Sequence, residues 1–571
     1  MKYNLLNKNF KENYTRELLK ARGVTDFESF FNPTEKLLQS PFDLDNISEG
    51  IQFIQDTINT ELPYALVVDC DVDGYTSAAI IYQYLKCLNP EKEIVYYIHS
   101  AKQHGLEDVW EDIAVREYAG VLLPDAGSND SCYAEQINCP ILVLDHHILE
   151  EKRELAPNMI LINNQESKAY KNKNLSGAGV TWQFCRALDE TLGKNYAENF
   201  IDLAALGVIA DMMSVIELEN RYIITKGLAN IKNFFFQTLI DKQSFPMKGK
   251  INPTTISFYI SPLINAMIRV GSQEEKERLF LAFIDGEQEV VSRKRGAKGA
   301  LEKVAIESAR ECINARNRQN AIKEKVDEKL EMKILKNGLD QNQILFLRLE
   351  DEDDFPPEMN GLVAMQLASK FNKPTIVGRL NDEGYIRGSA RGLNQSELVS
   401  FKDFLDSTSL FEYTAGHDNA FGISIPNHSL SRLHDIANKE LAHIDFNEDF
   451  YGVNFVRSAS ATDLVDLILD LGEQEDIWGQ HNAEPLIYIS ELNITDADIE
   501  IVGQRQDTVR IHKNGVTYMK FWAKDFIEEL KQFPEIQMNI IGTPNLNYWN
   551  GMVTPQILIS SYEILDGRLS F

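Results

Sequence analysis

The sequence lacks paired cysteines, long apolar runs and an excess of basic residues, and each absence argues against certain classes of protein. Its six cysteines are scattered over 571 residues and form no CxxC pair, which argues against a disulfide framework or a structural zinc site. We interpret them as reduced thiols of a cytoplasmic protein. The N-terminus is polar and charged, and no apolar run approaches the ~20 residues that span a bilayer. We therefore expect no secretion signal and no membrane partner.

The net charge is strongly acidic. The chain has 57 Lys and Arg against 86 Asp and Glu, a formal net charge of −29 at pH 7. This argues against sequence-blind coating of nucleic acid, because coating needs a basic face. It does not exclude a nuclease, whose metal-holding carboxylates are acidic. Lys and Arg outnumber Asp and Glu within 291–336, which is either a path for a phosphate backbone or a solvated helix face.

Length and pattern predict several domains. At roughly 100–200 residues per domain, three or four are expected, and 44% apolar with 25% charged residues is the balance of a folded protein. Short apolar runs that alternate with helical stretches predict a parallel α/β sheet. The expected order is a helical N-terminal extension (1–60), an α/β domain (61–285), a long helical connector (286–336), a second α/β domain (337–445), a linker (446–485) and a small β-barrel (486–571).

Carboxylates and histidines follow three predicted strands at the point where each strand ends. The first is followed by Asp69, Asp71 and Asp73, the second by Asp125, and the third by Asp145, His146 and His147. Because the carboxyl ends of parallel strands share one crevice, we expect these side chains to converge. Crowded carboxylates repel one another unless cations neutralise them, and Asp oxygens with imidazoles suit Mn²⁺ or Mg²⁺. Two such ions would bridge a phosphate, so the pattern predicts a phosphoesterase.

Each piece of this pattern has a plainer explanation. A single Asp after a strand is usually a helix cap, and a lone His-His pair usually lies on the surface or in a satisfied core. The joint pattern of DxDxDG, strand-Asp and strand-DHH is much harder to reach by accident, and it favours the metal site. Gly74 adds to it, because a tight turn there places a helix N-terminus near the phosphate.

The motifs resemble those of a known superfamily. DCDVDG, PDAG, LDHH and IADM look like the four motifs of the DHH phosphoesterases. Further motifs resemble RecJ-like single-stranded-DNA exonucleases with their DHHA1-type domain: SPLINAMIR (261–269), NGLVAMQLASKFNKPTIV (360–377), GSARG (388–392) and AGHDNAFGISI (415–425). The tail, with VGQRQDTVRIHKNGVTYMKFW, is similar to the RecJ OB-fold. The resemblance covers nearly the whole chain from about residue 60, in order.

The resemblance implies roles for individual residues. The metal-binding positions match Asp69, Asp71, Asp73, Asp125, His146 and Asp211. Asp145 would orient His146, and His147 would face the scissile phosphate, which makes these two the catalytic pair. The substrate positions match Asn265, Arg269, Ser389, Arg391 and His417. In the tail, Tyr548 and Trp549 are the better base-stacking candidates beside Phe521 and Trp522, although aromatics in a small barrel are more often core.

Three positions depart from the family pattern. Ile268 stands where the family usually has Gly, Ala415 replaces the first Gly of a Gly-Gly-His motif, and Cys70 sits where Tyr is common. These changes could alter the substrate channel. None of them removes an implied metal ligand.

Taken together, the resemblance implies an α/β protein with a parallel-sheet DHH domain, a long helical connector, a DHHA1-like domain and a C-terminal OB-fold β-barrel. Such a protein would hydrolyse single-stranded DNA from the 5′ end to mononucleotides with two Mn²⁺ or Mg²⁺ ions, in DNA recombination, repair and replication. Single-stranded DNA is the expected partner, with a single-strand-binding protein or a helicase as candidate protein partners.

Two alternatives stay open. A DHH-type phosphodiesterase of short oligonucleotides or cyclic dinucleotides would need neither the tail nor the basic stretch. A non-catalytic replication scaffold would not need every ligand position to be intact.

Overall fold

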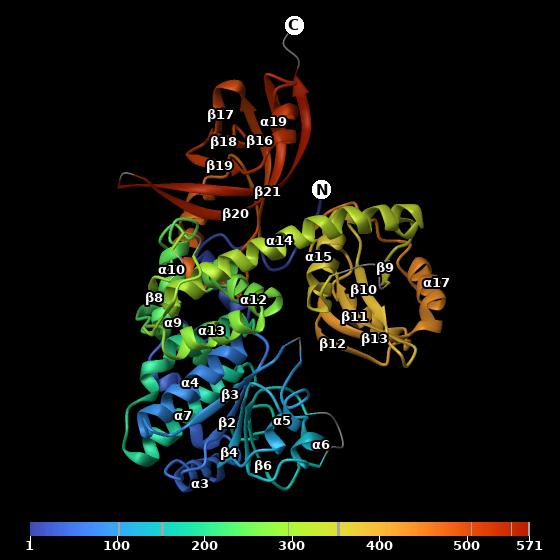
Figure 1. The fold of residues 1–571 in the computed structure, drawn as a ribbon. Coiled ribbons are helices and arrows are strands. Elements are labelled where there is room, and N and C mark those ends of the chain that lie inside the picture. Colours follow the sequence, from blue (N-terminus) through green and yellow to red (C-terminus); the bar gives the residue numbers. More distant parts are fainter. Residues whose placement is uncertain are drawn as a thin grey trace. The chain divides into compact units, whose positions relative to one another are not determined.

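The structure is a computed structural model, and it describes residues 1–100, 103–149, 154–294, 296–297, 299–350, 355–503, 505–549 and 551–568. The chain forms two units, each described by itself (Figure 1). The central unit comprises Asp26–Ile322 and Asp476–Asn482, and the terminal unit comprises Met1–Thr25, Lys323–Glu475 and Ala483–Phe571.

A five-stranded parallel sheet lies at the centre of the central unit. Its strands, in the order β3-β2-β4-β5-β6, are Ile94–Ile98, Tyr64–Val68, Gly120–Pro124, Ile141–Asp145 and Met159–Asn163. Every residue of β2, β4 and β5 is buried, as expected of a parallel sheet covered on both faces. The parallel sheet that the sequence predicted is confirmed.

Alternation along these strands divides the core into two layers. Leu66, Leu122 and Leu142 belong to one layer, with helices α3 (Ile47–Thr57), α4 (Val72–Leu88), α7 (Gly177–Leu192) and α8 (Ile201–Ala210). Val67, Leu123 and Val143 belong to the other, with the short helices α5 (Trp110–Ala114) and α6 (Ser131–Ala134) (Figure 1). All five strands run in one direction, so their carboxyl ends meet at one edge of the sheet.

Helices make up most of the remaining central unit. They are α2 (Phe27–Phe31), α9 (Leu218–Ala229), α10 (Phe234–Gln243), α11 (Pro253–Thr255), α12 (Ser261–Val270) and α13 (Gln273–Ile284). The helical connector expected from 286 begins only at α14 (Val304–Lys336), which continues into the terminal unit. An antiparallel pair, β7 (Glu289–Val291) and β8 (Leu301–Lys303), precedes it. The β-branched Val290 and Val291 favour a strand there, and Gly296 and Gly299 turn the chain at positive φ.

The terminal unit contains a second five-stranded sheet. Its strands, in the order β12-β13-β11-β10-β9, are Tyr413–His417, Ala420–Pro426, Tyr385–Arg391, Thr375–Leu380 and Leu345–Leu349. Only the β9–β10 pair of this sheet is parallel. Helix α15 (Asn360–Phe371) packs on β10 and β11, while α16 (Phe401–Ser407) and α17 (Leu430–Glu440) share a core with Ile386 and Ile423. The predicted second α/β region is confirmed.

A seven-stranded sheet forms the end of the chain. Its strands, in the order β15-β16-β20-β21-β19-β18-β17, are Phe455–Ser458, Ile487–Thr495, Glu535–Trp549, Met552–Arg568, Val516–Lys520, Thr508–Lys513 and Ile499–Val502. The strands β20 and β21 form a long hairpin in which Trp549 pairs with Met552 (Figure 1). Helix α19 (Lys524–Leu530) follows β19. The β-rich C-terminal region that the sequence predicted is confirmed, although β20 and β21 are long.

Two segments differ from what the sequence predicted. The segment 446–485, expected to be a linker, holds β14 (Phe450–Val453), β15 and helix α18 (Leu464–Gly472), which contacts β20 and β21. Acidic residues in this segment obscure an apolar stripe on α18. The stripe consists of four buried residues at helical spacing: Leu464, Leu467, Ile468 and Leu471. The N-terminal extension is not helical throughout: β1 (Lys2–Leu5) pairs with β14, and α1 (Tyr14–Ala21) lies in the same unit. No helix among the described residues is long and apolar enough to cross a membrane.

Candidate active site

The carboxyl edge of the central sheet brings the implied metal ligands together. Three groups each have one donor atom per residue within 4.8 Å of the others: Asp69–Asp71–Asp125, Asp73–His146–Asp211 and Asp125–Asp145–His146–His147. Asp125 and His146 each belong to two groups, so the three form one carboxylate cluster. Asp211 reaches it from the C-terminal cap of α8. Residues more than a hundred positions apart in the sequence therefore lie in one site.

The carboxylate cluster carries more negative charge than its protein partners neutralise. Oδ1 of Asp125 and Oδ2 of Asp211 are buried and accept no hydrogen bond from the described residues. Burial and the neighbouring carboxylates raise the pKa of both acids well above the usual range. Nε2 of His146 lies 3.3 Å from Asp125 and 3.5 Å from Asp211, and burial lowers the pKa of His146 to about 4. A neutral imidazole among buried carboxylate oxygens that accept no hydrogen bond is suited to binding a divalent cation such as Mn²⁺ or Mg²⁺.

Asp125 adopts an uncommon backbone conformation. Its φ is 64°, in the left-handed region that few residues other than glycine occupy. Its amide donates a 2.8 Å hydrogen bond to the carbonyl of Leu144, which ties the end of β4 to β5. Backbone strain of this kind concentrates at functional sites. The surrounding sheet therefore holds Asp125 in a conformation that this residue would rarely choose alone.

The N-terminus of α7 also contacts the carboxylate cluster. Asp73 accepts hydrogen bonds from the Ser176 hydroxyl at 2.9 Å and from the amides of Gly177 and Ala178 at 2.7 and 3.1 Å. A Cβ on Gly177 would lie 2.3 Å from Oδ1 of Asp125, so only glycine lets the helix approach this closely. The positive end of the helix stabilises the buried charge. The sequence analysis did not predict this contact, although the run Ser-Gly-Ala-Gly after a polar loop is a signal for a helix that begins close to a neighbouring group.

Asp145 orients a different histidine from the one expected. Its Oδ1 lies 2.8 Å from Nδ1 of His147 and accepts a 2.7 Å hydrogen bond from the His146 amide, while Oδ2 accepts one from the Ser128 amide at 3.0 Å. The ring that Asp145 contacts is thus that of His147, whereas the resemblance implied His146. Burial alone would raise the pKa of Asp145 and lower the pKa of His147. The pairing of the two side chains outweighs burial, so that the pKa of Asp145 is lowered and the pKa of His147 is raised to about 9. The His147 side chain is 55% exposed, and Asp145 leaves its Nε2 free to meet a substrate.

His104 is a neighbour that the sequence did not single out. Its Nδ1 lies 2.8 Å from Oδ2 of Asp69, and the Gly105 amide donates a 3.3 Å hydrogen bond to Oδ1. Both oxygens of Asp69 therefore already have partners. His104 comes from the loop between β3 and α5, where no strand end or motif marks it.

The implied substrate residues of the central unit lie on α12. Asn265 and Arg269 are partly exposed there. Burial lowers the pKa of Arg269, nearby Asp71 opposes that shift, and Arg316 of α14 adds to it. Arg269 therefore lies beside the carboxylate cluster, and Arg316 is a further cation in its neighbourhood that the sequence did not indicate.

The other implied substrate residues share one face of the sheet in the terminal unit. Arg391 pairs with Ala420 and Ala420 with His417 across β11, β13 and β12, so their side chains lie on the same face. Ser389 joins them, because residues two apart in a strand point the same way. A Cβ on Gly361, in the first turn of α15, would lie 2.4 Å from Nη2 of Arg391 and 3.6 Å from Oγ of Ser389. Arg391 and Ser389 therefore lie at the N-terminus of α15, and His417 lies two strands away on the same face.

The aromatic residues of the tail differ in exposure. Tyr548 is exposed near the turn of the β20–β21 hairpin, and the side chain of Trp549 lies outside the described residues. Trp522 is 84% exposed, and its ring centroid lies 6.1 Å from that of Phe521.

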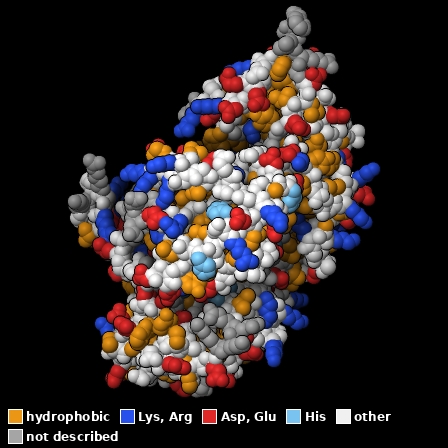
Figure 2. Space-filling view, turned by 90° about the vertical axis from the view of Figure 1, so that its right-hand side faces the viewer, with side chains coloured by type: hydrophobic (Ala, Val, Ile, Leu, Met, Phe, Trp, Pro, Cys, Tyr) orange, Lys and Arg blue, Asp and Glu red, His pale blue; other side chains and the backbone are white. Residues whose placement is uncertain are grey.

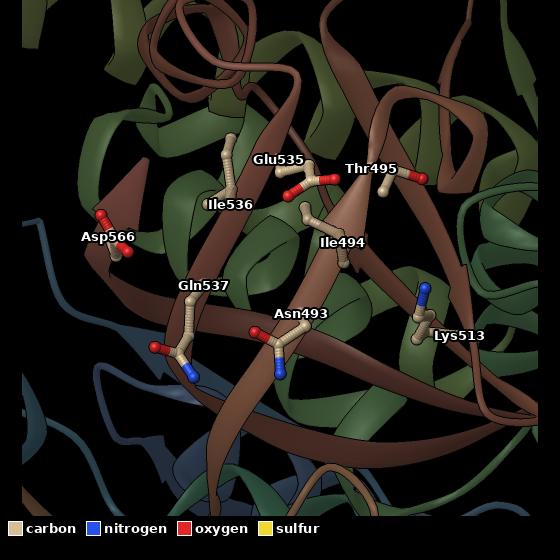
Figure 3. Close-up of a pocket in the computed structure, with 8 residues that line it drawn as sticks. All are labelled: Asn493, Ile494, Thr495, Lys513, Glu535, Ile536, Gln537 and Asp566. Atoms are coloured by element: carbon tan, nitrogen blue, oxygen red, sulfur yellow. The ribbon is translucent and has the colours of Figure 1, made fainter. Parts of the chain in front are cut away.

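At the opposite end of the hairpin, a cavity of about 360 Å³ is lined by Asn493, Ile494, Thr495, Lys513, Glu535, Ile536, Gln537 and Asp566 (Figure 3). Its carboxylates make it unsuited to a phosphate, since Lys513 is already paired with Asp498 at 2.8 Å.

Comparison with known proteins shows similarity over nearly the whole chain. Residues 64–208 match the DHH family, N-terminal domain, and residues 461–561 match the RecJ OB domain. YorK, an SPbeta prophage-derived protein of Bacillus subtilis provisionally described as a single-strand DNA-specific exonuclease, is 34% identical over 99% of this chain and 98% of its own. The single-stranded-DNA-specific exonuclease RecJ of Bacillus subtilis is 24% identical over 97% of this chain and 68% of its own.

Solved structures share the fold. The crystal structure of RecJ in complex with Mn²⁺ from Thermus thermophilus matches with a TM-score of 0.71 at 19% identity, covering 100% of this chain and 80% of that one. Its counterpart with Mg²⁺ has a TM-score of 0.66 at 17% identity, covering 100% and 79%. The arrangement of sheets and helices described above is therefore one that these structures also have.

Proposed function

Because the chain belongs to the family of RecJ-type single-stranded-DNA-specific exonucleases, we propose that it hydrolyses single-stranded DNA. We propose further that it works from the 5′ end, releases mononucleotides, and uses two Mn²⁺ or Mg²⁺ ions. One observation supports this above the others: buried carboxylate oxygens without donors gather around a neutral histidine at the carboxyl edge of a parallel sheet.

The carboxylate cluster supplies the residues that would hold the ions. Asp71, Asp73, Asp125, His146 and Asp211 are the proposed ligands. Asp69 is left out of this set because its two oxygens contact His104 and the Gly105 amide, on the loop beside the other ligands. When bound, two divalent ions lower the pKa of the attacking water and neutralise charge on the phosphate.

Two side chains of the central unit would act on the substrate directly. Asp145 fixes His147 so that Nδ1 faces the carboxylate and Nε2 faces outward, and the contact with Asp145 favours the protonated ring. His147 can therefore donate a hydrogen bond from Nε2 to an oxygen of the scissile phosphate. Arg269 adds a guanidinium beside Asp71, whose planar fork suits phosphate oxygens.

The terminal unit offers a site for the strand's 5′ end. A terminal phosphate carries more charge than an internal one. This face presents the Arg391 guanidinium and the Ser389 hydroxyl near the first turn of α15, with the His417 imidazole two strands away on the same face. Helix N-termini and arginine both favour phosphate. This arrangement supports recognition of a 5′-phosphate.

Contact with the strand would be local rather than spread over the surface. Figure 2 shows Lys and Arg side chains interspersed with Asp and Glu on the face in view, in keeping with the net charge of −29. A single-strand-binding protein or a helicase would be a suitable source of unpaired DNA. The enzyme itself would then bind through its phosphate sites and exposed aromatics.

The substrate class is tested by offering purified protein three substrates with Mn²⁺: a 5′-phosphorylated single strand, the same sequence as duplex, and a cyclic dinucleotide. We expect rapid release of mononucleotides from the single strand alone, and none after chelation of the metal. His147→Ala and Asp125→Asn serve as inactive controls. Preference for the cyclic dinucleotide would overturn the proposed substrate, and no hydrolysis of any substrate would favour a scaffold.

A further inference from the structure

A second group of donor atoms shares Asp69 with the carboxylate cluster and differs from the rest of it in chemistry. Sγ of Cys70 lies 3.7 Å from Nδ1 and 3.8 Å from Nε2 of His104, whose Nδ1 is 2.8 Å from Oδ2 of Asp69. One donor atom from each of the three lies within 4.8 Å of the others. The proposed hydrolysis uses neither the thiol nor the His104 imidazole.

We propose that Cys70, His104 and Asp69 form a binding site for a borderline-soft divalent cation, of which Zn²⁺ is the type. Sulfur, imidazole nitrogen and carboxylate oxygen are the donors that Zn²⁺ takes in proteins, whereas Mg²⁺ and Ca²⁺ prefer oxygen alone. The site is therefore separate in selectivity from the carboxylate cluster, whose three groups contain no cysteine.

The spacing of the donors suits tetrahedral coordination. With a metal–sulfur distance of ~2.3 Å and a metal–nitrogen distance of ~2.0 Å, neighbouring donors lie about 3.5 Å apart. Only one nitrogen of the ring can bind the cation, and the separation of 3.7 Å between Sγ of Cys70 and Nδ1 of His104 is close to this value already. The nitrogen–oxygen separation of 2.8 Å must widen by some tenths of an ångström, because a hydrogen bond now holds it. Three protein donors leave a fourth position for water or another ligand.

The proposed site is accessible from solvent, and its donor groups can balance the charge of the cation. The His104 side chain is 52% exposed, while that of Asp69 is 2% exposed, so the site opens to solvent through the imidazole. Binding replaces the thiol proton of Cys70 and the proton that His104 shares with Asp69. Two protons therefore leave as one cation enters, and the Cys70 thiolate and the Asp69 carboxylate balance its charge.

Co²⁺ provides a direct test, because it occupies zinc sites and gives a near-ultraviolet charge-transfer band only when a thiolate binds it. We expect the full-length protein, titrated with Co²⁺ in excess Mg²⁺, to develop this band and to saturate at one cation per chain. Cys70→Ser should abolish the band. Cys87→Ser and Cys132→Ser, which change exposed thiols, should keep it.

A second variant keeps the test decisive if Cys70→Ser does not fold. His104→Ala retains the thiol and alters a half-exposed side chain, and it should weaken Co²⁺ affinity by at least about tenfold. A missing band in the wild type, a band that survives Cys70→Ser, or an unchanged affinity in His104→Ala would overturn the site. The absorption readout does not depend on hydrolysis, so failure of the proposed nuclease activity would leave this result standing.

Discussion

The two units each gather polar side chains on a sheet, but the two gatherings have opposite character. In the central unit, buried carboxylates crowd around His146, and two of their oxygens accept no hydrogen bond from the described residues. In the terminal unit, Arg391, Ser389 and His417 share a more exposed face near a helix N-terminus. The first is suited to cations and the second to anions. We infer that hydrolysis and recognition of the strand's end reside in different units, so mutations should separate them.

The largest expected effect comes from Asp125→Asn. Asparagine tolerates the left-handed backbone at φ 64°, so this change removes charge without adding strain. Losing a shared ligand should reduce kcat by about a hundredfold or more on every single-stranded substrate, whatever its 5′ end. Initial rates with saturating Mn²⁺ measure this. More than about a tenth of wild-type activity, an effect of roughly 1.4 kcal/mol or less, would contradict the two-metal assignment.

Arg391→Ala should show the opposite selectivity. A charge-assisted hydrogen bond to a terminal phosphate is worth roughly 1.5–3 kcal/mol, so cleavage of a 5′-phosphorylated strand should fall about tenfold or more. Cleavage of a 5′-hydroxyl strand should change much less, and Mn²⁺ affinity should not change. Arg387→Ala is the matched control, because Arg387 lies on the same face of β11 and pairs instead with Glu383. Equal losses on the two strands would end the claim that this face recognises the 5′ end.

Exposed aromatics in the tail should have a smaller effect that depends on strand length. Deleting 486–571 would break the β15–β16 pair and uncover α18, so point substitutions are the cleaner change. Trp522→Ala and Tyr548→Ala should each weaken binding of a long strand about fivefold or more, at ~1–3 kcal/mol per stacked base, and leave a trinucleotide unaffected. Fluorescence anisotropy measures both, with Phe42→Ala as an exposed aromatic control. Equal weakening on both lengths would make these residues structural.

The smallest expected effect concerns stability without metal. The folded-state pKa of Asp125 is raised, so its contribution to stability is present below the unfolded pKa of about 4 and is lost as pH rises towards the folded value. In the presence of a chelator, the Asp125→Asn variant should therefore have a higher Tm than the wild type at pH 7. The expected difference is about 2–4 °C per kcal/mol of relieved repulsion.

This Tm difference should shrink towards pH 4, and Mn²⁺ should reverse its sign at neutral pH. Scanning calorimetry at several pH values measures both trends. Asp112→Asn, at an exposed acid of the same unit, should show no such trend. A difference that does not depend on pH would show that Asp125 is not under electrostatic strain.

Strand ends made much of the central site predictable. Asp69, Asp125 and Asp145 follow or close buried apolar runs, and parallel strands bring such ends together without any knowledge of long-range contacts. His104 and Gly177 could not be found in this way, since a loop and a helix start contribute them through tertiary packing. The partner of Asp145 was misjudged because adjacent histidines differ only in rotamer and backbone direction, which a motif does not specify. The linker prediction failed because acidic residues spread through 446–485 obscured α18, although that helix is itself mostly apolar.

The order of product release tests the central claim most directly. A 5′-phosphorylated single strand that carries one dye on its first base and a different dye on its last base is digested with Mn²⁺, and products are resolved over time. Separate catalytic and end-recognition sites predict that the 5′ dye appears first on a mononucleotide, while the 3′ dye stays on a strand that shortens gradually. First release of the 3′ dye, or internal fragments that carry neither end, would contradict the account.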